Sequence, residues 1–445
     1  MAKNFFRRKI IRVALVLLVC FVLIQFIRPS LDNLPVTGDL QAPPEVKSIL
    51  QRACYDCHSN ETRLAWFDKP APAYWLVAAH IKEGRQLLNF SHWDSLNADQ
   101  QKGKLFESLN QMVFKDMPLS QYTAFHGGAR VSDEDIKVLR KYLASLAPPK
   151  LADSAAVRSA GDQYAKWIAA AGPGPDVKPE PNGFAFLSGY GNWEAISSTE
   201  RWDNGTMRVI TGNPVAVKAI REGHTNPWPD GTAFAKIAWK SLLKPSGEIT
   251  PGQFLQVEFM LRDKKKYAAT GGWGWGRWKG DELKPYGKDA SFATECTHCH
   301  QPMHFNDLVF SSPVDWKAHA GAGSDTSVLD ALHWKVISSG IDKSDGTMYT
   351  LYGNDPAVDA ARKGTAYPAH SVLTLVTWKQ KEDEHWYGAN VPAAIASVET
   401  VTYGIDPEGM AYARYEGQPL KKVTAGAYVK GRWTYITGLK ASVMP

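Results

Sequence analysis

Cysteine is scarce in this sequence, which limits the kinds of site that the chain can build. Only five cysteines occur among 445 residues, and four of them lie in two copies of one short pattern. The copies are Cys54-Tyr-Asp-Cys57-His58 and Cys296-Thr-His-Cys299-His300. Zinc would need two more soft ligands for each cysteine pair, and Cys20 alone is left over. A redox dithiol would not need the histidine that ends each copy, and disulfides are the remaining alternative.

The C-x-x-C-H spacing is the pattern by which a chain holds haem covalently. Two thiols add across the two vinyl groups of the porphyrin while the histidine ligates the iron, so the size of the porphyrin sets both spacings. The sequence therefore predicts two covalently bound haem c groups. The predicted haem-binding residues are Cys54, Cys57 and His58 for the first group, and Cys296, Cys299 and His300 for the second.

A strong excess of one charge is also absent. The formal net charge is +6 over the whole chain, and part of it is concentrated at the N-terminus. This balance gives no reason to predict a nucleic-acid partner. The proportions of hydrophobic (44%) and charged (22%) residues are those of a globular chain that can bury sizeable cores.

A long apolar run occupies residues 10–27, interrupted by Arg12 and Gln25. At the helical rise it spans roughly 27 Å, close to the hydrocarbon thickness of a bilayer. Basic residues cluster before the run while Arg28 alone follows it closely, so the bulk of the chain is predicted to lie outside the cytoplasm. No small-x-small cleavage site follows, which favours an anchor over a signal peptide. We therefore predict a single-pass anchor at residues 1–28 in the bacterial inner membrane, with the remaining chain in the periplasm.

Residues 41–150 carry helical patterns around the first C-x-x-C-H copy. Val46, Ile49, Leu50 and Ala53 fall on one helical face, and Ser132 with Asp135 is a capping signal for a last helix. The sixth ligand of the first haem is predicted to be Met117, which precedes a proline ahead of that helix. The alternatives are a core methionine at this position, or ligation by His80, His92 or His126.

Several further motifs accompany this helical region: Trp75-Leu-Val, Glu83-Gly-Arg85, Asn89-Phe-Ser-His-Trp93 and Ala129-Arg-Val-Ser132. Together with the first C-x-x-C-H copy, they resemble the haem-binding domain found in many bacterial envelope proteins. The resemblance covers about a quarter of the chain. It implies haem binding and says little about a substrate.

After a Pro- and Ala-rich linker at 151–184, the pattern changes to short alternating stretches. Residues 254–262 alternate as a half-buried strand, with Glu258 on its polar side. Residues 271–278 alternate glycine with tryptophan, which suits a strand packed on a flat cofactor through Trp273 or Trp275, or plain core packing.

An internal repeat runs through this region, because the motifs of residues 193–240 recur in order in residues 334–379. Each copy predicts a strand, then a helix opened by Asn213 or Asp355 as its N-cap, then a second strand. Such duplicated units often pack as a pseudo-dimer.

Residues 185–322 resemble the cytochrome P-460 family through Asp203-Asn-Gly-Thr-Met207, Trp228-Pro-Asp-Gly-Thr-Ala-Phe-Ala-Lys236 and the second C-x-x-C-H copy with its trailing Asn306-Asp-Leu-Val-Phe310. The resemblance implies a mainly antiparallel β fold and a histidine-ligated haem with an open distal side. In the hydroxylamine-oxidising members it also implies a lysine cross-linked to the porphyrin. Lys236 stands at that position, although its spacing equally fits a solvated strand lysine. In the second copy Leu375 replaces it and no C-x-x-C-H follows, so that copy is predicted to be haem-free.

The predicted fold class is multidomain α plus β. It comprises a transmembrane helix (1–28), an all-α cytochrome c-like haem domain (41–150), a linker (151–184) and two mainly antiparallel β (α+β) cytochrome P-460-like repeats (185–322 and 323–445).

Three functions fit this organisation. The first is periplasmic electron transfer with a redox partner protein or a quinone-linked chain. The second is a hydroxylamine or nitric oxide oxidoreductase, with a small nitrogen ligand at the His300 haem, Lys236 and Glu258 as catalytic candidates, and Glu258 or His304 relaying protons. The third is gas binding without turnover.

Overall fold

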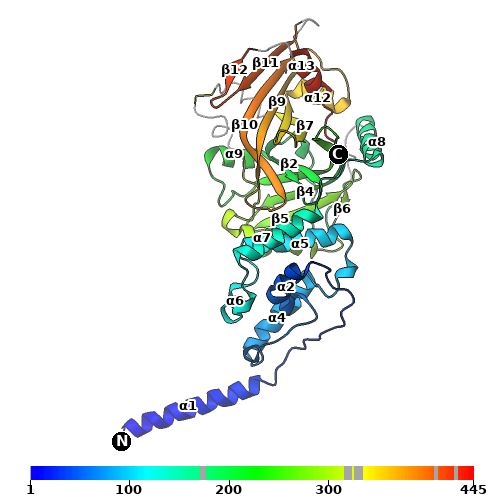
Figure 1. The fold of residues 1–445 in the computed structure, drawn as a ribbon. Helices are drawn as coiled ribbons and strands as arrows, with labels where there is room; N and C mark the ends of the chain where they lie inside the picture. Colours follow the sequence, from blue (N-terminus) through cyan, green and yellow to red (C-terminus); the bar gives the residue numbers. More distant parts are fainter. Residues whose placement is uncertain (1, 171–176, 315–322, 325–333, 405–408, 425–428) are drawn as a thin grey trace. The chain divides into compact units, whose positions relative to one another are not determined.

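The structure is a computed structural model that describes residues 2–170, 177–314, 323–324, 334–404, 409–424 and 429–445. The chain divides into two compact units, Met1–Leu146 and Ala147–Pro445. Figure 1 shows helices along the first unit and strands from β1 onward in the second. The predicted change from an all-α region to a β-rich region is confirmed.

Helices provide the regular structure described in the first unit: α1 (Ala2–Ile24), α2 (Pro44–Ala53), α3 (Tyr55–His58), η1 (Trp66–Asp68), α4 (Ala73–Leu87), η2 (Trp93–Ser95), α5 (Ala98–Val113), α6 (Ser120–Phe125), η3 (Gly127–Ala129) and α7 (Asp133–Leu146). On α2 the predicted apolar face is buried, with Val46 and Leu50 each 1% exposed. The predicted cap of α7 is present, because the Asp135 carboxylate accepts the Ser132 N–H at 2.7 Å and the Ser132 hydroxyl accepts the Asp135 N–H at 3.2 Å.

The N-terminal apolar run lies mostly on α1, and large side chains along it, such as Leu17 and Leu23, are exposed. Just past the helix, the Gln25 amide hydrogen-bonds both the N–H and the carbonyl of Ala71, at 2.8 and 3.0 Å. Across the described part of the chain, no helix combines the length and the apolar composition that crossing a membrane requires. The predicted transmembrane helix is therefore not found.

Strands dominate the second unit: β1 (Glu194–Arg201), β2 (Thr206–Gly212), β3 (Ala233–Leu243), β4 (Glu248–Arg262), β5 (Trp273–Lys279), β6 (Lys284–Pro285), β7 (Lys335–Asp342), β8 (Thr347–Gly353), β9 (Val372–Glu382), β10 (Ala389–Thr402), β11 (Ala411–Glu416) and β12 (Lys421–Val423). Its helices are α8 (Ser154–Ala169), η4 (Tyr190–Asn192), α9 (Pro214–Glu222), η5 (Ala268–Thr270), α10 (Phe292–His300), η6 (Gln301–Asn306), α12 (Asp355–Lys363) and α13 (Val429–Gly438).

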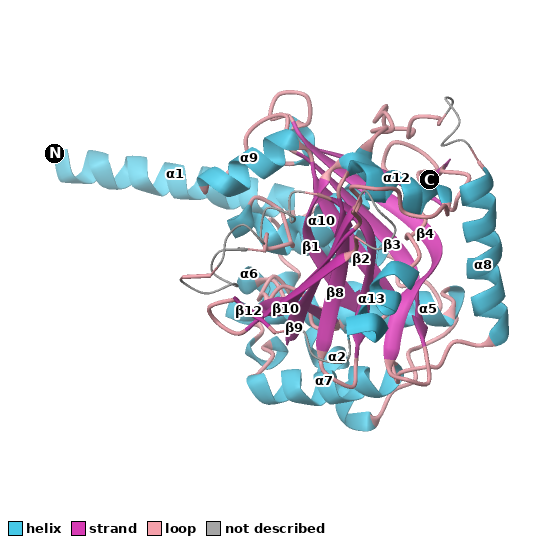
Figure 2. Cartoon of the chain, turned by 90° about the horizontal axis from the view of Figure 1, so that it is seen from above, coloured by secondary structure: helices cyan, strands magenta, loops and turns pink. Residues whose placement is uncertain are grey.

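The strands are joined antiparallel in the order β1-β2-β3-β4-β7-β8-β9-β10, and β10 returns to pair with β1. These strands therefore form a closed ring. β5 continues from β4, and β11 continues from β10. Figure 2 shows α8 alongside β4. The buried Gln163 amide fixes α8 there, because it accepts the N–H of Phe254 at 2.6 Å and donates to its carbonyl at 3.3 Å.

The register confirms the internal repeat. In the first copy, residues that pair from strand to strand across β2, β3, β4 and β5 form a row: Ile210, Lys236, Glu258 and Arg277. The corresponding row of the second copy is Leu351, Leu375, Glu399 and Arg414. The two copies join twice in the same manner, β4 to β7 and β10 to β1, as the predicted pseudo-dimer requires.

Asparagine caps position the helix of each copy. The Asn213 side-chain oxygen accepts the N–H groups of Ala216 on α9 and Ala233 on β3, both at 3.0 Å. Asn354 does the same at the start of α12 and β9. The predicted cap at Asp355 is therefore wrong. The asparagine is selected because one oxygen caps the helix and fixes the next strand at once.

Two layers of apolar side chains flank the strands. One layer is shared by both copies, since Val209, Ile237 and Val257 of the first join Val376 and Val398 of the second in one cluster. The opposite strand faces carry separate clusters. The first copy packs residues of α10 and the following loop over its outer face, and the second copy packs α13 over the corresponding face.

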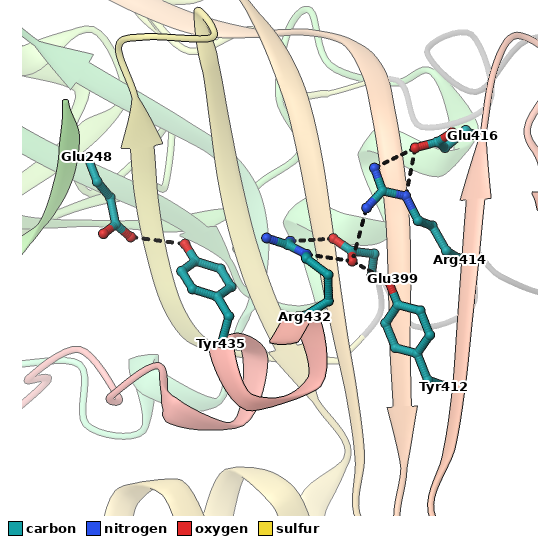
Figure 3. Close-up of polar contacts among 7 residues, drawn as sticks. All are labelled: Glu248, Glu399, Tyr412, Arg414, Glu416, Arg432 and Tyr435. Carbon is teal, nitrogen blue, oxygen red and sulfur yellow. Dashed lines mark hydrogen bonds and ion pairs between the residues drawn. The ribbon is translucent and has the colours of Figure 1, made fainter. Parts of the chain in front are cut away.

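A buried carboxylate holds α13 in place. Glu399 is 1% exposed, and its oxygens accept hydrogen bonds from Arg432 of α13, Arg414 of β11 and Tyr412 (Figure 3). Attraction to Arg432 outweighs the burial that opposes ionisation, so the pKa of Glu399 lies below its usual value. Arg432 thus supplies the charge that keeps this carboxylate ionised under the helix.

Replacing Arg432 with alanine should lower the free energy of unfolding of the second unit by about 2 kcal/mol. The loss leaves a buried carboxylate short of its main partner, but Arg432 is itself partly exposed, which moderates the cost. Urea unfolding followed by tryptophan fluorescence measures the change. The control is Lys363→Ala, which breaks an exposed pair with Asp359 and should cost less than about 0.5 kcal/mol. Equal effects from the two substitutions would contradict the role given to Arg432.

Candidate haem sites

The first C-x-x-C-H copy lies on α3, directly after α2. Burial lowers the pKa of His58, which keeps its imidazole neutral and able to ligate a metal. The His58 Nδ1 atom lies 3.0 Å from the carbonyl oxygen of Gly84 and 3.1 Å from that of Leu88, at the end of α4. A proton on Nδ1 donates to these carbonyls and leaves Nε2 as the ligand atom.

Gly84 permits this close approach of α4 to the motif. A Cβ at position 84 would lie 2.8 Å from the carbonyl oxygen of Cys57 and 3.3 Å from the His58 ring. Because the first contact is with backbone, it could be relieved only by moving α4 or α3. The glycine is thus part of the haem site, although sequence reasoning noted it only within a resemblance motif.

The contacts of the histidines bear on the choice of sixth ligand. His92 uses both ring nitrogens, with Thr37 and Asn60 as partners. His126 also uses both, with the carbonyl of Tyr122 and the carboxylate of Asp68. Neither ring offers a nitrogen to iron without breaking these contacts, which leaves Met117 and His80 as candidates.

The loop that bears Met117 is attached to the haem motif through the next helix. Tyr122 on α6 donates its hydroxyl proton to Asp56 at 2.7 Å, and Asp56 lies between the two motif cysteines. The Tyr122 ring also stacks on His126, with ring centroids 4.0 Å apart. This attachment keeps residues 117–122 near the motif, and Met117 as sixth ligand stays a prediction.

The second C-x-x-C-H motif lies at the end of α10. His300 Nδ1 lies 2.7 Å from the carbonyl oxygen of Leu308, and the ring is flanked by Trp275 and Phe310, with centroids 4.6 and 4.8 Å away. Burial lowers the pKa of His300 to about 4, against the effect of the Leu308 hydrogen bond. The imidazole is therefore neutral and fixed in orientation, as an iron ligand should be.

A strained loop presents the Leu308 carbonyl to His300. Asp307 and Leu308 have φ values of 49° and 66°, in the left-handed region. The Asp307 carboxylate pairs with Arg262 at 3.1 Å, and its backbone oxygen accepts the indole N–H of Trp273 at 2.8 Å. Trp273 and Trp275 are both buried in one apolar cluster, so core packing is confirmed for both. Trp275 also lies against the His300 ring, and its packing on a cofactor stays a prediction.

The structure brings Lys236 and Glu258 together on neighbouring strands. Lys236 Nζ lies 2.7 Å from the Glu258 carboxylate, and Arg277 Nη2 lies 3.3 Å from the same oxygen. Burial lowers the pKa of Lys236 to about 8, although Glu258 attracts the proton. Burial opposes ionisation of Glu258, but Arg277, Lys236 and Arg208 together hold its pKa well below the usual range.

This charged row lies within electrostatic reach of the second motif. Burial is the largest influence on both groups: it raises the pKa of Cys296 and lowers the pKa of His300. The charges of Lys236, Glu258 and Arg277 are close enough to affect both pKa values as well. His304, the other candidate for proton relay, is exposed and hydrogen-bonds the Gln301 carbonyl. Of the relay candidates, the structure thus places Glu258 in the charged row.

The residues around the second motif fit a haem. Within the described residues, the indole N–H of Trp275 and the Nε–H groups of Arg208 and Arg277 are buried without a hydrogen-bond partner. Arginine donors of this kind suit the carboxylates of haem propionates. Burial raises the pKa of Cys54 and Cys296 to about 12, so these thiols stay protonated and are poor ligands for a free metal ion. Among the residues described, no group of three or more His, Cys, Asp or Glu could hold a metal ion.

Two known protein families match the chain. The haem-binding domain family matches residues 19–145, and the cytochrome P460 family matches residues 187–311 and 332–427. The chain thus matches a haem-binding domain family first and the cytochrome P460 family after it, in the predicted order. The cytochrome P460 match covers both copies of the repeat, including the one without a C-x-x-C-H motif. No curated protein matches the chain.

The two copies of the repeat differ in what covers their outer face. In the first copy the row containing Lys236 faces α10 with its haem motif. In the second copy Leu375 packs with Ile436 of α13 in one apolar cluster. In the second copy, α13 therefore occupies the position that α10 and its haem motif occupy in the first copy.

Replacing Gly84 with alanine should reduce covalent haem at Cys54 and Cys57 and destabilise the first unit by about 1–3 kcal/mol, because the new methyl group meets backbone. The measurement is haem content by mass spectrometry together with thermal unfolding. Gly103→Ala is the matched control: it lies on α5, its Cβ would meet nothing within 4 Å, and helix propensity predicts a gain of about 0.5–1 kcal/mol. Normal haem loading in the Gly84 variant would show that α4 does not need this close approach.

Proposed function

We propose that the chain is a dihaem c-type cytochrome of the bacterial periplasm, in which the haem at His300 binds and oxidises a small nitrogen ligand, hydroxylamine or nitric oxide. The observation that carries the proposal is the charged row of Lys236, Glu258 and Arg277 beside the His300 motif. A haem bound there supplies an iron coordination position and an electron acceptor.

The chain's own residues contribute proton transfer and electrostatics in this proposal. Near neutral pH a minor but significant fraction of Lys236 is neutral, since its pKa is about 8, so the amine can accept a proton from a ligand such as hydroxylamine. Glu258 stays ionised and holds the lysine in place. Its role is therefore electrostatic rather than that of a general base. If Lys236 is instead joined to the porphyrin, as in the hydroxylamine-oxidising members, its amine cannot accept a proton and Glu258 keeps its pairing with Arg277.

The first haem serves electron transfer in this proposal. Met117 would close its sixth position, and a thioether ligand favours reversible electron transfer over ligand binding. Electrons from the second site would leave through this haem to a redox partner protein or a quinone-linked chain.

Gas binding or electron transfer without turnover is the second candidate. Trp275 and Phe310 pack against the His300 ring, and such packing holds a ligating imidazole fixed, as electron transfer or reversible gas binding without turnover requires. A cross-link at Lys236 would favour the oxidase, and its absence would favour the gas binder.

Titration with nitric oxide or hydroxylamine should perturb the haem at His300 at low concentration and leave the haem at His58 nearly unchanged. The physical reason is that Met117 closes the first iron, whereas the second has no such ligand assigned. Electron paramagnetic resonance distinguishes the two irons. Met117→Ala should make the first haem responsive too, and Cys296→Ala with Cys299→Ala should leave a single covalent haem. Two low-spin, ligand-inert haems in the wild type would exclude the open-site mechanism.

Residues 1–28 are proposed to hold the chain at the inner membrane, with the remainder in the periplasm. What supports this is the exposed apolar surface of α1, including Leu15, Leu17 and Leu23. Removing residues 1–30 and adding a cleavable export signal should give a haem-loaded protein in the soluble periplasmic fraction, while the full chain sediments with membranes. Sedimentation of the shortened chain would show that another surface holds the membrane.

A further inference from the structure

The haem-free copy reaches the haem motif of the first copy through the loop between β9 and β10, residues 383–388. His385 Nδ1 lies 2.6 Å from the backbone oxygen of Phe310. The Trp386 ring meets the Phe310 ring edge-on, with centroids 5.8 Å apart. Phe310 in turn packs edge-on against His300 at 4.8 Å. Two residues of the second copy therefore contact the residue that flanks the iron ligand.

The loop is anchored firmly enough to act as a support. The Trp386 indole N–H donates to the Asp203 carboxylate at 3.0 Å, and the Arg201 guanidinium lies 4.2 Å from the centre of the Trp386 ring. Arg201 and Asp203 also form an ion pair with each other, and both are largely buried. The pairing of Arg201 with Ala389 joins this whole group to the strand ring.

The position of the loop follows from the pseudo-dimer and is matched on the other side. The corresponding turn of the first copy ends at Glu248, which occupies the register position of Ala389. Glu248 accepts a hydrogen bond at 2.9 Å from Tyr435 of α13 (Figure 3). It accepts another at 2.9 Å from Tyr349 of β8. Each copy thus extends one turn over the outer face of the other. On the haem-free side the turn meets α13, and on the haem side it meets the loop after the motif.

We propose that His385 and Trp386 of the haem-free copy are positioning residues for the haem at His300, acting by holding Phe310 against the His300 ring. This inference rests on the proposed haem at His300. Phe310 follows Leu308, whose carbonyl accepts the His300 proton, by two residues. Fixing Phe310 therefore fixes both the packing and the hydrogen bond that set the orientation of His300. Such outer contacts determine the rotation and basicity of a ligating imidazole, and through them the reduction potential.

The test uses the full haem-loaded chain with His385→Ala and Trp386→Ala. Both variants should retain two covalent haems by mass spectrometry. Their second haem should show a shifted midpoint potential and broadened electron paramagnetic resonance lines, while the first haem is unchanged. His385→Asn, which keeps an N–H donor near the Nδ1 position, should restore most of the wild-type potential. The matched control is Glu384→Ala in the same loop, whose side chain is 74% exposed and pairs with Lys381, and it should change neither haem.

The outcomes separate this inference from the proposed function. Absence of covalent haem at Cys296 and Cys299 in the wild type would overturn the proposed function itself. Two haems with wild-type potentials in both alanine variants would overturn the positioning role alone. If an alanine variant fails to retain its second haem, His385→Phe decides, because it keeps the ring and removes the donor. An unchanged potential in that variant would refute the hydrogen-bond role, and a shift would support it.

Discussion

Both haem motifs depend on one interaction, a hydrogen bond from the Nδ1 side of the ligating histidine to a backbone carbonyl. His58 makes it to the end of α4, and His300 makes it to the loop after α10. Because carbonyl oxygens only accept, each bond fixes the histidine tautomer and leaves Nε2 as the atom able to ligate iron. The two units meet this need differently. In the first unit a glycine lets one helix approach another, and in the second a left-handed turn is held by Arg262.

Duplication gives the second unit a rigid frame in which the copies have diverged. Glu258 and Glu399 occupy the same register position, and an arginine of the neighbouring strand, Arg277 or Arg414, pairs with each. The further cation differs: Lys236 comes from the adjacent strand in one copy, and Arg432 comes from α13 in the other. A buried carboxylate requires a compensating charge, so loss of the lysine is accommodated by a cation from a different element.

This exchange also accounts for the C-terminal helix. A strand face that carries Leu375 instead of a lysine is apolar, and α13 covers it with residues such as Ile436. Covering that face removes apolar area from water and leaves the second copy with a filled outer surface. The copy then contributes to the site as a frame, through the strand pairing of β10 with β1 and the loop that follows β9.

The sequence by itself determined the haem motifs, the helical and β-rich regions and the repeat with its substituted lysine, because these depend on local spacing and periodicity. It offered Lys236 and Glu258 as two separate candidates, with no sign that they are in contact. It also predicted Asp355 as the N-cap of α12, one residue after the actual cap, Asn354. Only the tertiary structure decided that Lys236, Glu258 and Arg277 form one row, that Trp273 is core while Trp275 flanks His300, and that His385 supports Phe310. These facts depend on strand register and on the closure of the ring. Both are set by contacts between residues far apart in the chain, which leave no local pattern in the sequence.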